Sequence, residues 1–167
     1  RDPSHEPSLA TPEGVAARFV RDQLAPLGAE LVATEWSIFD ADASVVASID
    51  AVARFADGSL ALVDWKHTLG LGERSCSTRR LAPPLAHLPD CDVVRYALQL
   101  AIYAQILEQR YGFEVRCLAL VNAHPDDLFF TDLPYLRNAA AVLLEHGRST
   151  VPYTHLTLPT APSAPSS

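Results

Sequence analysis

The chain has 167 residues, which is enough for one domain with a substantial hydrophobic core. Its formal net charge of −7 excludes a protein that coats nucleic acid through a broadly basic surface, but it leaves room for an enzyme that holds a polyanion in one local cleft. No apolar run approaches the roughly 20 residues of a membrane span, and we expect no membrane partner.

In chain order the pattern predicts a helix, a three-strand meander, a helix, a strand and a last helix. Thr11 is a typical N-cap, and Gly112 is a typical helix end. The pattern therefore predicts an α/β domain with a mixed sheet, in the order α-β-β-β-α-β-α. The expected helices cover residues 12–24, 93–111 and 134–146, with Asp92 capping the second, and the expected strands cover 31–39, 45–55, 60–67 and 115–121.

The two ends of the chain lack a core pattern. We expect residues 1–10 to be disordered and residues 11–148 to form the single domain. Residues 151–167 are rich in proline, serine and threonine, and we interpret them as a low-complexity tail of non-native origin. Further domains fused to this one are expected to be missing from the sequence.

The three cysteines, Cys76, Cys91 and Cys117, form no CxxC pair and show no zinc spacing. This pattern predicts three free thiols and a protein of a reducing intracellular compartment, with cytoplasm, nucleus and organelle left open.

Charged residues lie in two strongly apolar strands. Asp50 lies in the second predicted strand, and Asp64, Trp65 and Lys66 end the third. An unpaired charge in a buried strand costs several kcal/mol. A divalent metal with a phosphate beside it would offset this cost.

The turn between the two strands decides whether the acids meet. If Ala56, Asp57 and Gly58 form a three-residue hairpin loop, Asp50 lies opposite Asp64. A two-residue turn would instead place the two acids on opposite faces of the sheet.

The same counting around the turn at residues 40–44 places Glu35 opposite Asp50, which completes a row of three carboxylates with Asp64. Such a row needs a cation, and oxygen ligands favour Mg²⁺ or Mn²⁺. The alternative is a solvated acidic face with Lys66 as an ion-pair partner.

A polar stripe runs along the second predicted helix. Arg95, Gln99 and Tyr103 are four residues apart and share one side of the helix. Gln99 and Tyr103 could reach the water or phosphate of a site at the acids. Alternatively, Tyr103 fills the core and Gln99 is a satisfied amide.

Together these segments resemble the PD-(D/E)XK nuclease superfamily, in particular its RecB-like exonuclease branch. The resemblance rests on Ser48-Ile49-Asp50, on Asp64-Trp65-Lys66 and on the Q-x-x-x-Y pattern of Gln99 and Tyr103. It implies a restriction-endonuclease-like core and metal-dependent cleavage of DNA. The four cysteines that hold an iron–sulfur cluster in some relatives are absent, so no such cluster is expected.

The resemblance also implies roles for single residues. Asp50 and Asp64 would bind the metal, helped by the backbone carbonyl of Trp65. Lys66 would position or activate the attacking water. The site would be completed by Gln99 and Tyr103, with Glu35 as a further acid.

The expected function is a Mg²⁺- or Mn²⁺-dependent DNA nuclease, either an exonuclease or a DNA-end processor of the kind used in repair and recombination. Arg79, Arg80 and Arg95 would grip the DNA backbone independently of its sequence, or would merely keep a loop soluble. Two alternatives remain: a non-catalytic nucleic-acid-binding or assembly module that retains the nuclease fold, and an RNA-processing nuclease.

Overall fold

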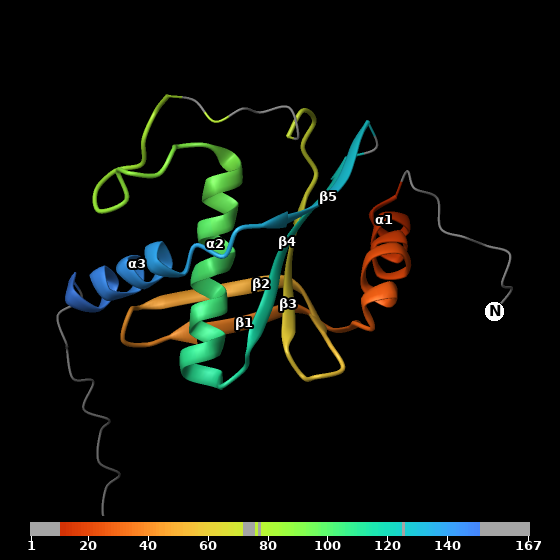
Figure 1. Cartoon of the computed structure of the whole chain (residues 1–167), viewed down its shortest axis with the longest axis horizontal. Helices are drawn as coiled ribbons and strands as arrows, with labels where there is room; N and C mark the ends of the chain where they lie inside the picture. Colours follow the sequence, from red (N-terminus) through yellow and green to blue (C-terminus); the bar gives the residue numbers. More distant parts are fainter. Residues whose placement is uncertain (1–10, 72–75, 77, 125, 151–167) are drawn as a thin grey trace, which may run out of the picture.

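A five-stranded mixed sheet organises the protein, with helices on both of its faces (Figure 1). The computed structural model describes residues 11–71, 76, 78–124 and 126–150, so the two predicted terminal segments lie outside the described residues. The strands are β1 (Glu30–Asp40), β2 (Val45–Arg54), β3 (Leu60–Lys66), β4 (Val115–His124) and β5 (Asp127–Leu133). The helices are α1 (Pro12–Phe19), η1 (Val20–Leu24), η2 (Ala25–Leu27), α2 (Asp92–Ile106), η3 (Leu107–Tyr111) and α3 (Arg137–Thr150).

The strands lie in the order β1-β2-β3-β4-β5. The first three form an antiparallel meander, β4 runs parallel to β3, and β5 is antiparallel to β4. Helix α2 makes the crossover between β3 and β4, as a parallel connection requires. The predicted α/β fold and its core order are therefore confirmed, with one strand added.

The added strand, β5, was not predicted because its sequence lacks the alternation of a half-buried strand. Three consecutive apolar residues pack on different faces of the sheet. Phe129 packs with the core beneath α2, while Leu128 and Phe130 pack with the core beneath α1. A run of this kind carries no period that distinguishes a strand from a loop.

Alternation along β3 divides the core into two layers. Leu60 and Leu62 pack with residues of α2 and α3, and Ala61 and Val63 pack with residues of α1 and η1. Within the part of the chain that the structure describes, no helix is long and apolar enough to cross a membrane.

The hairpin between β2 and β3 has the three-residue loop on which the predicted register depends. The Phe55 N–H donates to the Ser59 carbonyl at 2.9 Å, and the Gly58 N–H donates to the Phe55 carbonyl at 2.9 Å. Gly58 has a φ of 87°, a left-handed conformation that costs glycine little. Arg54 pairs with Leu60 and Ala51 with Val63, which is the predicted register.

Two of the three predicted helix ends are confirmed. The Gly14 N–H donates to Thr11 Oγ1 at 3.2 Å, and Gly112 ends η3 with a φ of 73°. Asp92 was predicted to cap α2, but this prediction is wrong. Cys91 is the N-cap, without a side-chain hydrogen bond, and Asp92 is the first helical residue.

The prediction of three free thiols is wrong as well, because Cys76 and Cys91 form a disulfide and only Cys117 is free among the cysteines. The chain between them folds back on itself. Arg80 pairs with Pro89 in an antiparallel bridge, which brings the two ends of this loop together. The spacing of the cysteines in the sequence predicts neither this loop nor the disulfide.

Candidate active site

Asp64 and Lys66 form a close ion pair at the carboxyl end of β3. Both side chains lie on the α2 side of the sheet, because they are two and four residues beyond Leu62. Lys66 Nζ lies 2.7 Å from Asp64 Oδ2, and the Asp64 side chain is only 3% exposed. Asp64 Oδ2 is buried, and the Lys66 ammonium is its close charged neighbour.

Asp50 joins this pair from the neighbouring strand. Its Oδ2 accepts a hydrogen bond of 2.9 Å from the backbone N–H of Trp65, the residue between Asp64 and Lys66. Burial raises the pKa of Asp64, the ion pair with Lys66 opposes this, and the negative charge of Asp50 raises the pKa further. The structure thus brings together the two acids and the lysine that the sequence singled out.

Helix α2 completes the cluster with Gln99 and Tyr103. Gln99 Nε2 donates to Asp64 Oδ1 at 3.2 Å. Burial and then the charges of Asp64 and Asp50 raise the pKa of the Tyr103 phenol, which places Tyr103 within the field of both acids. Both residues therefore lie where the predicted stripe puts them.

Tyr96, one turn earlier on α2, also belongs to the cluster, although no role was predicted for it. The centroid of its ring lies 4.7 Å from Lys66 Nζ. A sequence signal did exist, because Tyr96 lies three residues before Gln99 and so on the same side of the helix. This signal is weak on its own, because aromatic residues at helical spacing usually fill the core.

The strand register places Glu35 level with Asp50, as predicted, because the flanking pairs are Thr34 with Ala51 and Trp36 with Ile49. The Glu35 side chain nevertheless does not join the two acids. Glu35 has a φ of 50° and is exposed, and its Oε2 accepts a hydrogen bond of 3.3 Å from Ser48 Oγ. Ala33 and Trp36, three residues apart, pack against the same core, so the alternation of sides shifts at this point of β1. Among the described residues no group of three or more His, Cys, Asp or Glu side chains could hold a metal ion.

The remaining acids still fit a magnesium or manganese ion. Mg²⁺ is commonly bound by one or two carboxylates, with water and substrate phosphate as the other ligands. The single ammonium of Lys66 does not balance the two neighbouring carboxylates of Asp50 and Asp64, so a divalent cation would stabilise the pair of acids. Metal binding by Asp50, Asp64 and the carbonyl of Trp65 remains a prediction.

Of the three arginines predicted to contact DNA, Arg79 and Arg80 lie in the loop before α2, and Arg95 lies in the first turn of α2. Arg95 pairs with Asp90, with its Nη2 2.6 Å from Oδ1, and Arg79 Nη2 lies 3.6 Å from Asp90 Oδ2. Arg80 Nη1 donates to the His87 carbonyl at 3.4 Å. Asp90 therefore neutralises part of the positive charge of this loop.

Asn122 is a buried residue beside the site for which the sequence predicted no role. It pairs with Lys66 in the β3–β4 ladder and is 0% exposed. Its Oδ1 accepts from the Thr68 N–H at 3.1 Å, and its Nδ2 donates to the Thr68 carbonyl at 2.8 Å. These bonds fix the course of the chain directly after Lys66. A polar residue ending the apolar run 118–121 was the available signal.

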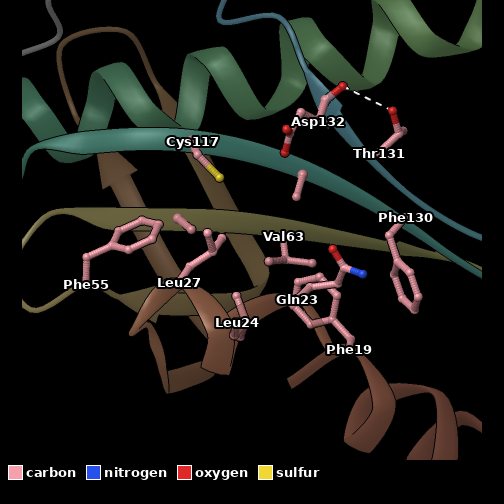
Figure 2. A pocket seen from close by; sticks show the side chains of 12 residues that line it. Phe19, Gln23, Leu24, Leu27, Phe55, Val63, Cys117, Phe130, Thr131 and Asp132 are labelled. Atoms are coloured by element: carbon pink, nitrogen blue, oxygen red, sulfur yellow. Dashed lines mark hydrogen bonds between the residues drawn. The ribbon is translucent and has the colours of Figure 1, made fainter. Parts of the chain in front are cut away.

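An apolar cavity of about 160 Å³ lies on the opposite face of the sheet (Figure 2). It is lined mainly by apolar side chains of η1, η2 and the sheet, among them Leu24, Phe55, Val63 and Phe130. None of the predicted site residues lines this cavity. The candidate active site is the cluster of Asp50, Asp64, Lys66, Gln99 and Tyr103 on the α2 side of the sheet.

Comparisons with known proteins give a limited result. No protein-family model matches the chain, and no curated protein matches it. Among solved structures it is similar to a "Putative exonuclease" from Eubacterium rectale, with 18% identity, a TM-score of 0.46, and coverage of 83% of this chain and 49% of the other. It is also similar to the protein SSO0001, with 18% identity, a TM-score of 0.37, and coverage of 84% and 58%. The chain thus spans about half the length of the first protein.

Proposed function

We propose that this protein is a Mg²⁺- or Mn²⁺-dependent nuclease that hydrolyses phosphodiester bonds of DNA. The observation that carries the proposal is the pairing of a 3%-exposed Asp64 carboxylate with Lys66, next to Asp50. A buried acid whose pKa burial raises costs stability when it is ionised, so its presence calls for a function.

Each residue of the cluster has a separate task in this proposal. Asp50 and Asp64 would hold the metal, which lowers the pKa of water and stabilises charge on phosphate oxygens when it is bound. The ammonium of Lys66 offsets the negative charge of the phosphate and orients the attacking water. Gln99 keeps the Asp64 carboxylate in place through its hydrogen bond to Oδ1.

DNA is the proposed substrate, and its ends are the proposed point of attack. Arg79, Arg80 and Arg95 would contact phosphates without reading the base sequence. The preference for DNA ends and a place in repair or recombination rest on the resemblance to the RecB-like branch.

The experiment that tests this function compares substrates labelled at the 5′ or 3′ end. Linear single-stranded DNA, linear double-stranded DNA, a covalently closed circle and RNA of the same sequence are each incubated with the protein and Mg²⁺, Mn²⁺ or EDTA. We expect degradation of linear DNA with either metal and none in EDTA.

Other results would change the proposal in defined ways. Cleavage of the closed circle would show endonuclease action, and faster cleavage of RNA would make the protein a ribonuclease. Binding of DNA without cleavage under every metal condition would contradict the enzyme proposal and favour a non-catalytic binding module.

A further inference from the structure

Lys66 has an aromatic neighbour as well as an acidic one. Its Nζ lies 4.7 Å from the centroid of the Tyr96 ring and 2.7 Å from Asp64 Oδ2. The two contacts come from different elements, since Tyr96 is on α2 and Asp64 is on β3. The ammonium is therefore held between a helix and a strand.

The aromatic contact supplies an orientation that the ion pair alone lacks. A lysine side chain is flexible, and its ammonium has three rotatable donors that one carboxylate oxygen does not fix in a single orientation. The face of a tyrosine ring attracts a cation through its quadrupole. The ring also packs against the core beneath α2, which limits its own movement.

Tyr96 lies on the same side of α2 as the other site residues of this helix. Tyr96, Gln99 and Tyr103 are separated by three and four residues and share one side of the helix. Gln99 contacts Asp64 while Tyr96 contacts Lys66. One face of α2 thus holds both members of the ion pair.

We propose that Tyr96 is a positioning residue for Lys66, acting through its ring and not through its hydroxyl group. The kinetic part of this inference rests on the proposed nuclease function, whereas the contact itself can be tested without any activity.

Lys66 is the single lysine among the 13 Lys and Arg residues of the chain, which makes a direct test possible. Protein labelled with ¹³C,¹⁵N-lysine gives one set of lysine side-chain NMR signals. We expect the Hε protons of Lys66 to be shifted upfield by the Tyr96 ring. The shift should persist in Tyr96→Phe and be lost in Tyr96→Leu, with thermal melting as the control for folding.

The kinetic test uses the same variants with saturating Mg²⁺ and labelled DNA. Tyr96→Leu should lower kcat about tenfold with KM nearly unchanged, because the lost contact acts on the transition state. Tyr96→Phe should stay within about twofold of the parent, since it retains the ring. If Tyr96→Leu does not fold, Tyr96→Met replaces it.

Two results would overturn the inference: Lys66 signals that do not respond to Tyr96→Leu, or equal kcat values for the Leu and Phe variants. If the parent protein cleaves no nucleic acid, the proposed function fails, and the Lys66 chemical shifts still decide whether Tyr96 holds the ammonium.

Discussion

Asp64 combines burial with charge in a way that most carboxylates avoid. Burial raises its pKa, the ion pair with Lys66 lowers it, and the charge of Asp50 raises it again, with a net upward shift. When folding raises the pKa of an acid, the protein is most stable at a pH below the pKa of that acid in the unfolded chain. This stability is lost as the pH rises through the pKa of the acid in the folded state. Ionised Asp64 therefore destabilises the metal-free protein near neutral pH.

The variant Asp64→Asn tests this conclusion. Without metal and near neutral pH, we expect it to melt at a higher temperature than the parent, with the difference shrinking as the pH falls toward the ordinary pKa of 3.8. Added Mg²⁺ should raise the melting temperature of the parent and leave the variant unchanged. A variant that melts lower under metal-free conditions would contradict the account.

The sequence predicted correctly the positions that strand register and helix period fix. Asp50, Asp64 and Gln99 follow from such counting. The register of Glu35 with Asp50 follows as well, but its side chain contacts Ser48, because a φ of 50° at Glu35 interrupts the alternation of β1. A sequence reading that assumes regular strands cannot foresee such a local change. The contact of Tyr96 with Lys66 is likewise tertiary and depends on how α2 lies on the sheet.

Among the elements, the β2–β3 hairpin sets the site, since its loop length decides which face carries the acids. Gly58 has a φ of 87°, and a Cβ built there would have no neighbouring atom within 4 Å. A side chain at this position would therefore destabilise the protein through backbone strain and not through a steric clash. We expect Gly58→Val to lower the unfolding free energy by about 1–3 kcal/mol.

The matched control at this position is Gly58→Asn, because asparagine tolerates the left-handed conformation. We expect this variant to lower the unfolding free energy by only about 0.5 kcal/mol, which is typical of a substitution that a turn tolerates. Chemical denaturation measures both variants. Equal losses would show that the loop does not need a left-handed residue at Gly58.

A second element-scale feature is the buried Asp40 at the end of β1. Its carboxylate accepts hydrogen bonds from Arg110 of η3 and Arg148 of α3, and from the backbone N–H groups of Asp42 and Ala43. Burial acts to raise the pKa of Asp40, but these bonds outweigh it and lower the pKa from 3.8 to about 2. The β1–β2 hairpin is thereby tied to both helical segments.

The lowered pKa of Asp40 predicts how stability depends on pH. A depressed pKa contributes stability above the unfolded value of 3.8 that is lost as the pH falls through about 2. We expect Asp40→Asn to lose about 2 kcal/mol near neutral pH and nothing at the acid end of this window. Asp42→Asn, which changes a 44%-exposed side chain, should lose less than about 1 kcal/mol.

At the scale of the whole molecule, the arrangement of layers was predictable and the loops were not. Hydrophobic period and turn residues predicted the meander, the helix that follows it and the strand that became β4. The strand β5 lacks alternation, and the Cys76–Cys91 disulfide depends on a loop that folds back on itself. Both features arise from contacts between distant parts of the chain, which local patterns do not encode.

The net charge of −7 also acts at this scale, because it would limit how strongly the protein holds the proposed DNA substrate. The positive charge near the site lies on a few arginines that Asp90 partly neutralises. We expect the apparent affinity for DNA to fall with salt with a slope of about −3 or shallower. Arg95→Ala should reduce this slope by about 1, and Asp90→Asn should raise the affinity. An unchanged slope in Arg95→Ala would remove this residue from the DNA contact.

The most direct test of the central claim is single-turnover cleavage of end-labelled linear DNA with saturating Mg²⁺. The parent is compared with Asp64→Asn, Lys66→Ala and Glu35→Gln, the last serving as a control because the Glu35 carboxylate accepts a hydrogen bond from Ser48 and not from the site residues. We expect losses of at least about 100-fold for the first two variants and less than about threefold for Glu35→Gln. Equal rates for the parent, Asp64→Asn and Lys66→Ala would contradict the account.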